Sequence, residues 1–233
     1  IQGTGVQYDT RKMGWLGAME SGVAVMAVWA KAPATTLEQA MTTEIAWGSS
    51  GPRNNGYIVP VIMQKLFGYK FKMVSGYSGS ADVLLAMERG EVHGRVNTWS
   101  SLKEARPQWF KEPKQAVVMA AVSYDPIPDV PDAIPIIKLA KTPEQKEIMD
   151  FILVSTVLGR AFVAGPDVPA DRLAALRKAF DETMKDPAFL KEAEEHKAVI
   201  EPIGGAKLQA IVNDAASVSP ALVAKIDAML APK

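Results

Sequence analysis

Residues 45–56 read IAWGSSGPRNNG, an apolar strand that runs into a turn rich in glycine, serine and asparagine and then into the start of a helix. Residues 71–80 (FKMVSGYSGS) and residues 95–101 (RVNTWSS) have the same layout. Such a turn places backbone N–H groups at the positive end of a helix dipole, where proteins hold small anions. Three such turns close together in the sequence predict a binding cleft.

The first half of the chain alternates between apolar strands and helices, which is typical of a parallel sheet with crossover helices. We predict strands over residues 21–30, 44–47, 71–74, 92–96 and 115–121, with helices over 35–41, 57–67 and 81–89 and a short helix from 101. Thr35 with Glu38, and Ser101 with Glu104, have the spacing of capping boxes. Pro60 is expected in the first turn of its helix, and Gly68 is expected to end that helix.

The second half is predicted to be mainly helical. Four prolines predict a loop over residues 124–135. We then expect helices over 142–155, 169–185, 187–196, 206–216 and 220–230, with a short strand at 162–164.

Composition excludes several classes of function. The 233 residues carry 26 basic and 26 acidic side chains, so no basic excess exists to neutralise a nucleic-acid backbone. The absence of cysteine excludes disulfides, thiolate catalysis and cysteine-based zinc sites. No apolar run is long enough to span a bilayer. Because the chain begins at Ile1 without a signal peptide, we expect it to be processed or truncated.

Catalysis is not expected. His93 and His196 are the only histidines and lie a hundred residues apart, His93 in a predicted loop or surface position and His196 in a charged helix end. The sequence has no metal-protease motif, nucleophile elbow or P-loop, and no base is predicted within reach of a serine nucleophile. We therefore predict no enzyme activity, no cofactor and no metal site.

The predicted ligand residues are small polar and aromatic residues of the three turns. They are Gly48, Ser49, Ser50, Gly51, Arg53, Asn54, Asn55, Tyr77, Ser78, Gly79, Ser80, Asn97, Thr98, Trp99 and Ser100. Backbone N–H groups and serine and threonine hydroxyls are the donors that a carboxylate needs.

Some of these residues have two interpretations. Arg53 is expected either to form a bidentate pair with a ligand carboxylate, or to face solvent or pair with an acidic side chain of its own part of the protein. At least one of Asn54 and Asn55 is expected to cap a helix. Tyr77 and Trp99 are expected either to stack on a ligand or to pack the turns against the sheet.

Several segments, in order along the chain, resemble one receptor family. They are residues 8–12 (YDTRK) with 15–17 (WLG), 47–51 (WGSSG), 76–79 (GYSG) with 86–92 (AMERGEV), 128–131 (PDVP) and 164–169 (AGPDVP). Together they are similar to the substrate-binding receptors of tripartite tricarboxylate transporters, the Bug receptors. Arg53 departs from the pattern, since neutral small residues are common at that place in the family.

The resemblance implies an α/β fold of the type II periplasmic-binding-protein class, with two lobes, a hinge and a cleft between them. Residues 1–24 and 160–233 would form the first lobe and residues 25–159 the second, with the N-terminal third of the family, including a signal peptide and a first-lobe ligand loop, preceding this chain. The implied function is periplasmic capture of a small carboxylate and its delivery to the permease subunits of the transporter. A sensor module that signals to a membrane partner is the alternative.

Overall fold

The computed structural model describes residues 8–196 and 198–231, so the expectation about Ile1 lies outside the described residues. The fold is α/β, as predicted. The chain divides into two compact units: unit 1 comprises residues 1–22 and 154–223, and unit 2 comprises residues 23–153 and 224–233. Each unit has its own sheet.

Unit 2 is built on a five-stranded sheet with the order β4-β3-β5-β2-β6. Its strands are β2 (Ala24–Trp29), β3 (Ile45–Ser49), β4 (Phe71–Ser75), β5 (Gly94–Thr98) and β6 (Ala116–Val122). Strand β3 pairs in parallel with β4 and β5, as the alternation predicted. The prediction of a parallel sheet is wrong for β2, which lies between β5 and β6 and is antiparallel to both.

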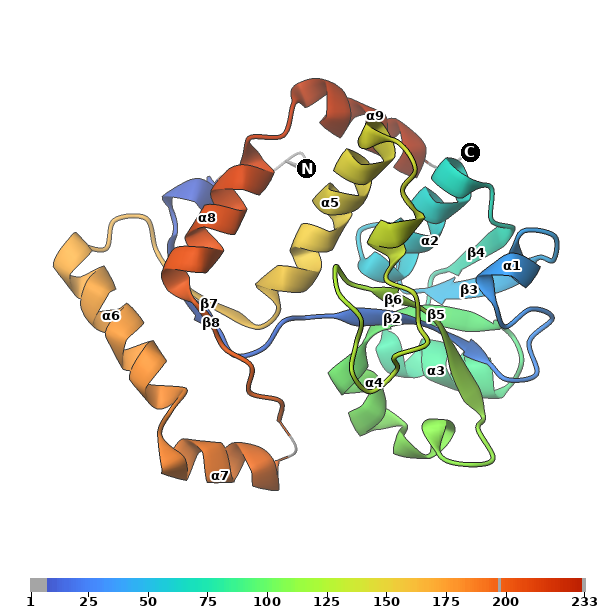
Figure 1. The fold of residues 1–233 in the computed structure, drawn as a ribbon, viewed down its shortest axis with the longest axis horizontal. Helices are drawn as coiled ribbons and strands as arrows, with labels where there is room; N and C mark the ends of the chain where they lie inside the picture. The colour runs from blue at the N-terminus through green and yellow to red at the C-terminus, as the bar shows by residue number, and fades with distance from the viewer. Residues whose placement is uncertain (1–7, 197, 232–233) are drawn as a thin grey trace. The chain divides into compact units, whose positions relative to one another are not determined.

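Helices cover both faces of this sheet (Figure 1). Helix α2 (Asn55–Phe67) packs on β3, β4 and β5, whereas α3 (Ser80–Glu88) and α4 (Trp99–Ala105) lie on the opposite face. Buried apolar side chains such as Val83, Met87 and Leu102 fill the space between α3, α4 and the sheet. This packing positions the ends of β3, β4 and β5, where the chain continues into α2, α3 and α4.

The helix caps differ in detail from the sequence predictions. The capping box of α1 (Leu37–Ala40) is formed by Thr36 and Gln39, not by Thr35 and Glu38. The predicted box at Ser101 and Glu104 is wrong, because β5 continues to Thr98 and α4 follows it directly.

Helix α2 begins two residues earlier than predicted, so Pro60 lies beyond its first turn. Gly68 ends the helix as expected, with a left-handed φ of 82°. Both termini of α2 are thus capped, at Asn54 and at Gly68.

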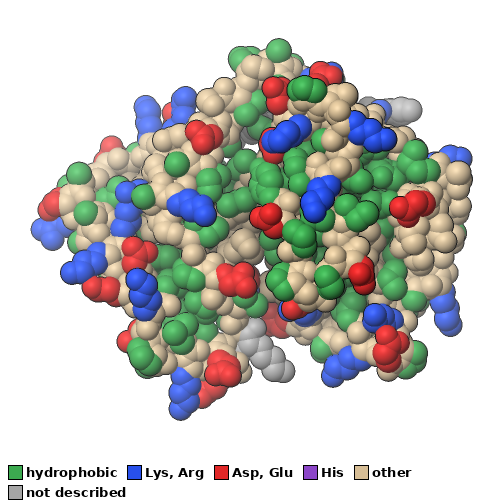
Figure 2. Space-filling model, in the orientation of Figure 1, with side chains coloured by type: hydrophobic (Ala, Val, Ile, Leu, Met, Phe, Trp, Pro, Cys, Tyr) green, Lys and Arg blue, Asp and Glu red, His purple; other side chains and the backbone are tan. Residues whose placement is uncertain are grey.

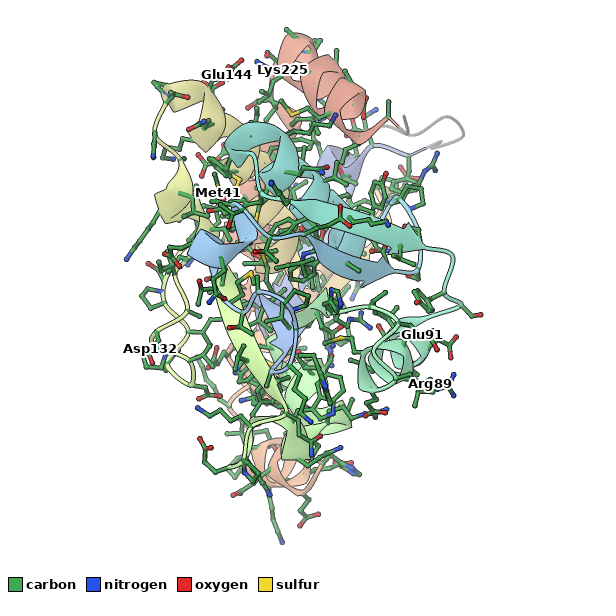
Figure 3. All side chains as sticks on the ribbon, turned by 90° about the vertical axis from the view of Figure 1, so that its right-hand side faces the viewer. Met41, Arg89, Glu91, Asp132, Glu144 and Lys225 are labelled. Carbon is green, nitrogen blue, oxygen red and sulfur yellow. The ribbon has the colours of Figure 1, made fainter. Side chains whose placement is uncertain are left out.

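The remaining segments of unit 2 pack around the sheet. The short 3-10 helices Pro107–Phe110 and Ile136–Leu139 flank β6 and the predicted loop at 124–135. Helix α5 (Pro143–Leu158) begins in this unit, where the Tyr124 hydroxyl donates to the Asp150 carbonyl over 3.1 Å. Glu144 of α5 forms an ion pair with Lys225 of α9 (Pro220–Leu230) (Figure 3), which joins the end of the chain to unit 2.

Unit 1 has a small antiparallel sheet with the order β7-β1-β8. It contains the 3-10 helix Thr10–Lys12, strands β1 (Gly14–Ala18), β7 (Ala161–Ala164) and β8 (Ile203–Gly204), and helices α6 (Ala170–Thr183), α7 (Pro187–Glu195) and α8 (Gly205–Ala216). Trp15 and Ala18 of β1 pack against Leu208 and Val212 of α8. Gly205 is required at this contact, since a Cβ there would lie 2.3 Å from the Trp15 carbonyl oxygen.

Charge is mixed across the surface. On the face drawn in Figure 2, basic and acidic side chains alternate without a large patch of one sign. Within the described residues, no helix is both long and apolar enough to cross a membrane.

Candidate ligand-binding pocket

A pocket of about 190 Å³ lies in unit 2 where strand ends meet helix starts. The carboxyl ends of β3 and β5, the first residue of β2, and the starts of α2 and α3 surround it. Its lining residues are Ala24, Gly48, Ser49, Ser50, Asn54, Asn55, Gly56, Ser80, Arg95, Val96, Asn97 and Thr98. Ligands of open α/β sheets bind outside the carboxyl ends of the strands, which is the position of this pocket.

The turn between β3 and α2 is held rigid by its own side chains. The buried Ser49 hydroxyl accepts from the Gly51 N–H over 3.2 Å and lies 3.0 Å from the Gly51 carbonyl oxygen. The Asn54 amide oxygen caps α2 by accepting from the Tyr57 N–H over 3.2 Å, and its NH₂ donates to the Ser50 hydroxyl over 2.9 Å. The pocket wall from this turn is therefore preorganised before any ligand binds.

Helix α3 begins without a side-chain cap. Its N-cap is Gly79, which offers no side-chain oxygen to the first N–H groups of the helix. Uncapped N–H groups at a helix start carry partial positive charge and suit an anion. Ser80, the first residue of α3, is the one residue of the turn between β4 and α3 that lines the pocket.

Strand β5 contributes Arg95, which is buried with 8% of its surface exposed. Its Nη1 donates to the Ser80 carbonyl oxygen over 2.6 Å, and its Nη2 donates to the Ser80 hydroxyl over 3.0 Å and to the Asn97 amide oxygen over 3.1 Å. Burial lowers the pKa of Arg95 to about 10, so the guanidinium still carries its charge at neutral pH. Arg95 is the one charged residue in the pocket lining.

The structure brings eight of the predicted ligand residues together and leaves seven outside the pocket. Gly48, Ser49, Ser50, Asn54, Asn55, Ser80, Asn97 and Thr98 line it. Gly51, Arg53, Tyr77, Ser78, Gly79, Trp99 and Ser100 do not. No bound molecule tests these assignments, so a role in binding stays a prediction for both groups.

Four of the residues with two interpretations have clear surroundings. Arg53 is exposed, and Tyr77 packs against the core of unit 2. Trp99 is buried, and its Nε1 donates to Asp129 over 3.1 Å. Lys103 also donates to this carboxylate, and these two hydrogen bonds, the Lys103 bond first, lower the pKa of Asp129. Asn54 has the capping role that was expected of one of the two asparagines.

Sequence reasoning missed four residues that line the pocket, namely Arg95, Ala24, Gly56 and Val96. A signal for Arg95 was present. Side chains two residues apart in a strand share a face of the sheet, so a strand that places Asn97 at a site also places Arg95 near it. A charged residue within a largely buried strand is itself unusual.

The other features of the described residues offer weaker sites. An open hollow of about 630 Å³ lies along α6, but all its lining residues, from Ala170 to Lys185, come from this helix and the short segment just after it. No group of three or more His, Asp or Glu side chains positioned for a metal occurs in the described part of the chain. His93 is half-buried and accepts from the Ala46 N–H through Nδ1, while His196 is exposed, as expected.

Comparison with known sequences gives no assignment. No family model matches this sequence. A search of the curated proteins also finds no match.

Comparison with solved structures is informative. A ligand-free TctC solute-binding protein from Polaromonas superposes with a TM-score of 0.67 at 12% identity, covering 94% of this chain and 72% of the other. The chain has the fold of the TctC-type solute-binding proteins. Rpa4515 of R. palustris, solved with adipate, gives a TM-score of 0.63 at 15% identity, covering 96% of this chain and 70% of the other. MatC from Rhodopseudomonas palustris, solved with malate, gives a TM-score of 0.60 at 14% identity, covering 97% of this chain and 73% of the other.

Proposed function

We propose that this protein is a periplasmic receptor that captures a small organic acid and delivers it to the permease of a tripartite tricarboxylate-type transporter. The supporting observation is the unit 2 pocket, which combines two helix starts with hydroxyl, amide and guanidinium donors. The TctC-type fold adds support, because two solved proteins with this fold hold the carboxylates adipate and malate.

The chemistry of the pocket favours an anion. An ionised carboxylate only accepts hydrogen bonds, and the lining includes no carboxylate that would repel it. One helix start contributes about 0.3–1 kcal/mol to anion binding at an exposed site and up to about 2 kcal/mol when partly buried. The starts of α2 and α3 border the same pocket, so their contributions favour the same ligand group.

The pocket is small for a complete ligand site. Its volume of about 190 Å³ lies below the roughly 300–1,000 Å³ of typical ligand pockets. We therefore infer that it receives the carboxylate end of a ligand. The proposed lobes are residues 1–24 with 160–233 and residues 25–159, and hinge closure of a two-lobed receptor is a general way to enclose the rest of a ligand.

A thermal-shift screen tests this function. The panel contains acetate, malate, adipate, citrate and benzoate, with a neutral sugar and an amine as controls. A specific ligand at 100 times its Kd stabilises the folded protein by about 2.7 kcal/mol, which raises the Tm of a chain of this size by about 5–10 °C. Silence toward every acid, together with a response to the sugar or the amine, would overturn the proposal.

A further inference from the structure

Arg95 has an unusual electrostatic position. Its side chain comes from the second residue of β5 and is more than nine-tenths buried. None of the ion pairs within the described residues involves Arg95, whereas most buried charges in proteins are paired. The other residues that line the pocket are all uncharged, so this region carries one formal positive charge.

The neighbours of Arg95 hold the guanidinium in place without neutralising it. Its four hydrogen bonds go to neutral oxygens: the carbonyls of Ser80 and Val96, the Ser80 hydroxyl and the Asn97 amide. A guanidinium has five N–H donors, and these bonds use four of them. The fifth, on Nη1, has no acceptor within the described part of the chain.

The guanidinium also orients its neighbours. Because arginine only donates, Asn97 must turn its amide oxygen toward Arg95, which leaves the Asn97 NH₂ as a donor. The Ser80 hydroxyl likewise accepts from Arg95 and keeps its own hydrogen for another acceptor. Three donors of different kinds therefore remain for a ligand: one Nη1 N–H of Arg95, the Asn97 NH₂ and the Ser80 hydroxyl.

We propose that Arg95 is the ion-pair partner of the ligand carboxylate, that Ser80 and Asn97 complete the carboxylate site, and that this charge makes the pocket select an acid over its neutral amide. The proposal rests on the proposed function and assigns the cationic role to Arg95 rather than to the exposed Arg53. A buried charge without a counter-ion is costly to the folded protein, and a ligand carboxylate supplies that counter-ion.

A purely structural Arg95 makes different predictions. In that role it would only tie β5 to the start of α3 through Ser80, and its removal would lower stability without changing which ligands bind. As a ligand partner, its removal takes away an uncompensated buried charge, so affinity falls while stability is kept or gained. Selectivity and stability measured together therefore separate the two roles.

The experiment compares the unaltered chain with Arg95→Met, Arg95→Lys and, as a matched control, Arg53→Ala. Isothermal titration is carried out with acetate, malate, adipate and benzoate and with the amide of each acid, and Tm is recorded for each protein without ligand. We expect Arg95→Met to weaken acid binding by at least about tenfold and to bring the acid-to-amide ratio of affinities close to one, since hydrogen bonds to charged groups are worth about 1.5–3 kcal/mol. Its Tm should equal or exceed that of the unaltered chain.

The other two variants refine the result. Arg95→Lys should retain part of the preference for the acid, because lysine keeps the charge but loses the planar fork of the guanidinium. If Arg95→Met does not fold, the acid-to-amide ratio of Arg95→Lys decides. If the cationic role belongs to Arg95, Arg53→Ala should keep the acid-to-amide ratio of the unaltered chain.

The failures of the two proposals are distinguishable. If the unaltered chain binds acids and the Arg95 variants keep the same acid-to-amide ratio, this inference is wrong and the receptor function stands. A ratio that falls in Arg53→Ala instead would return the cationic role to Arg53. If the unaltered chain binds none of the acids of the thermal-shift panel and responds to the sugar or the amine instead, the receptor proposal fails, and this inference fails with it.

Discussion

The turn between β3 and α2 and the turn between β4 and α3 have the same sequence layout but different structural roles. The second turn contributes only Ser80 to the pocket. The first turn and the residues beside it contribute Gly48, Ser49, Ser50, Asn54, Asn55 and Gly56. The first is held together by the hydrogen bonds of Ser49 and Asn54, while most of the second is exposed.

Strand order explains the difference. Strand β4 is at the edge of the sheet, and β3 lies between β4 and β5. The pocket forms beside the carboxyl ends of β3 and β5, so the turn after β3 lines it along its length and the turn after β4 reaches it only at the helix start. A sequence motif thus predicts a turn, but the position of its strand in the sheet decides what the turn contacts.

The largest expected difference between the two turns is in their tolerance of a side chain at glycine. A Cβ on Gly48 would lie 2.5 Å from Val83 Cγ1 and 3.0 Å from Val92 Cγ2, both in the core. We expect Gly48→Ala to lower the free energy of unfolding by about 1–3 kcal/mol through overpacking. Urea denaturation measures the change.

The matched control is Gly79→Ala in the second turn. A Cβ there has no neighbour within 4 Å, and the φ of −175° is extended backbone that any residue adopts. The entropic gain from replacing glycine and the weaker N-cap preference of alanine oppose each other, so the change should stay below about 1 kcal/mol. Equal losses in the two variants would contradict the contrast drawn between the turns.

An intermediate effect is expected from the polar network of the first turn. Asn54→Ala removes the cap of α2 and the bond to Ser50, and should lower the free energy of unfolding by about 1 kcal/mol. We also expect weaker binding of the acid found in the thermal-shift screen, because the pocket wall becomes less rigid. Ser78→Ala, at an exposed position in the second turn, is the control, and a comparable loss of stability there would refute the assignment.

The smallest expected effect concerns Asp129, whose carboxylate accepts a hydrogen bond from Trp99 at the start of α4. Its folded pKa is lowered by the Lys103 and Trp99 hydrogen bonds, so its stabilising contribution is present above the unfolded value near 3.8 and is lost as pH falls through the folded pKa. The pair is largely exposed, so Asp129→Asn should cost less than about 1 kcal/mol. Urea midpoints of the variant and the unaltered chain should differ at pH 6 and converge as the pH falls below 3.8 through the folded pKa of Asp129, with equal ligand affinity at pH 6.

Local sequence patterns predicted most of unit 2 correctly. The first two strand-turn-helix segments exist, whereas β5 runs directly into α4 without a turn. Gly68 ends α2, and the prolines of residues 124–135 mark a loop. The patterns failed where a neighbouring segment decides the structure. Strand β1, with two glycines in five residues, has little strand propensity and forms because it pairs with β7 and β8 and packs against α8.

Residue order alone accounts for the helix starts that attract anions, since those depend on glycine, serine and asparagine within a few positions of one another. Only the folded chain shows which of two arginines stands at the pocket. Arg53 lies in the turn itself and extends toward solvent, whereas Arg95 comes from a strand forty residues later and is carried to the start of α3 by sheet pairing. Burial and long-range strand order are properties of the whole fold, which is why residues 95–101 alone did not show that Arg95 is buried beside the pocket.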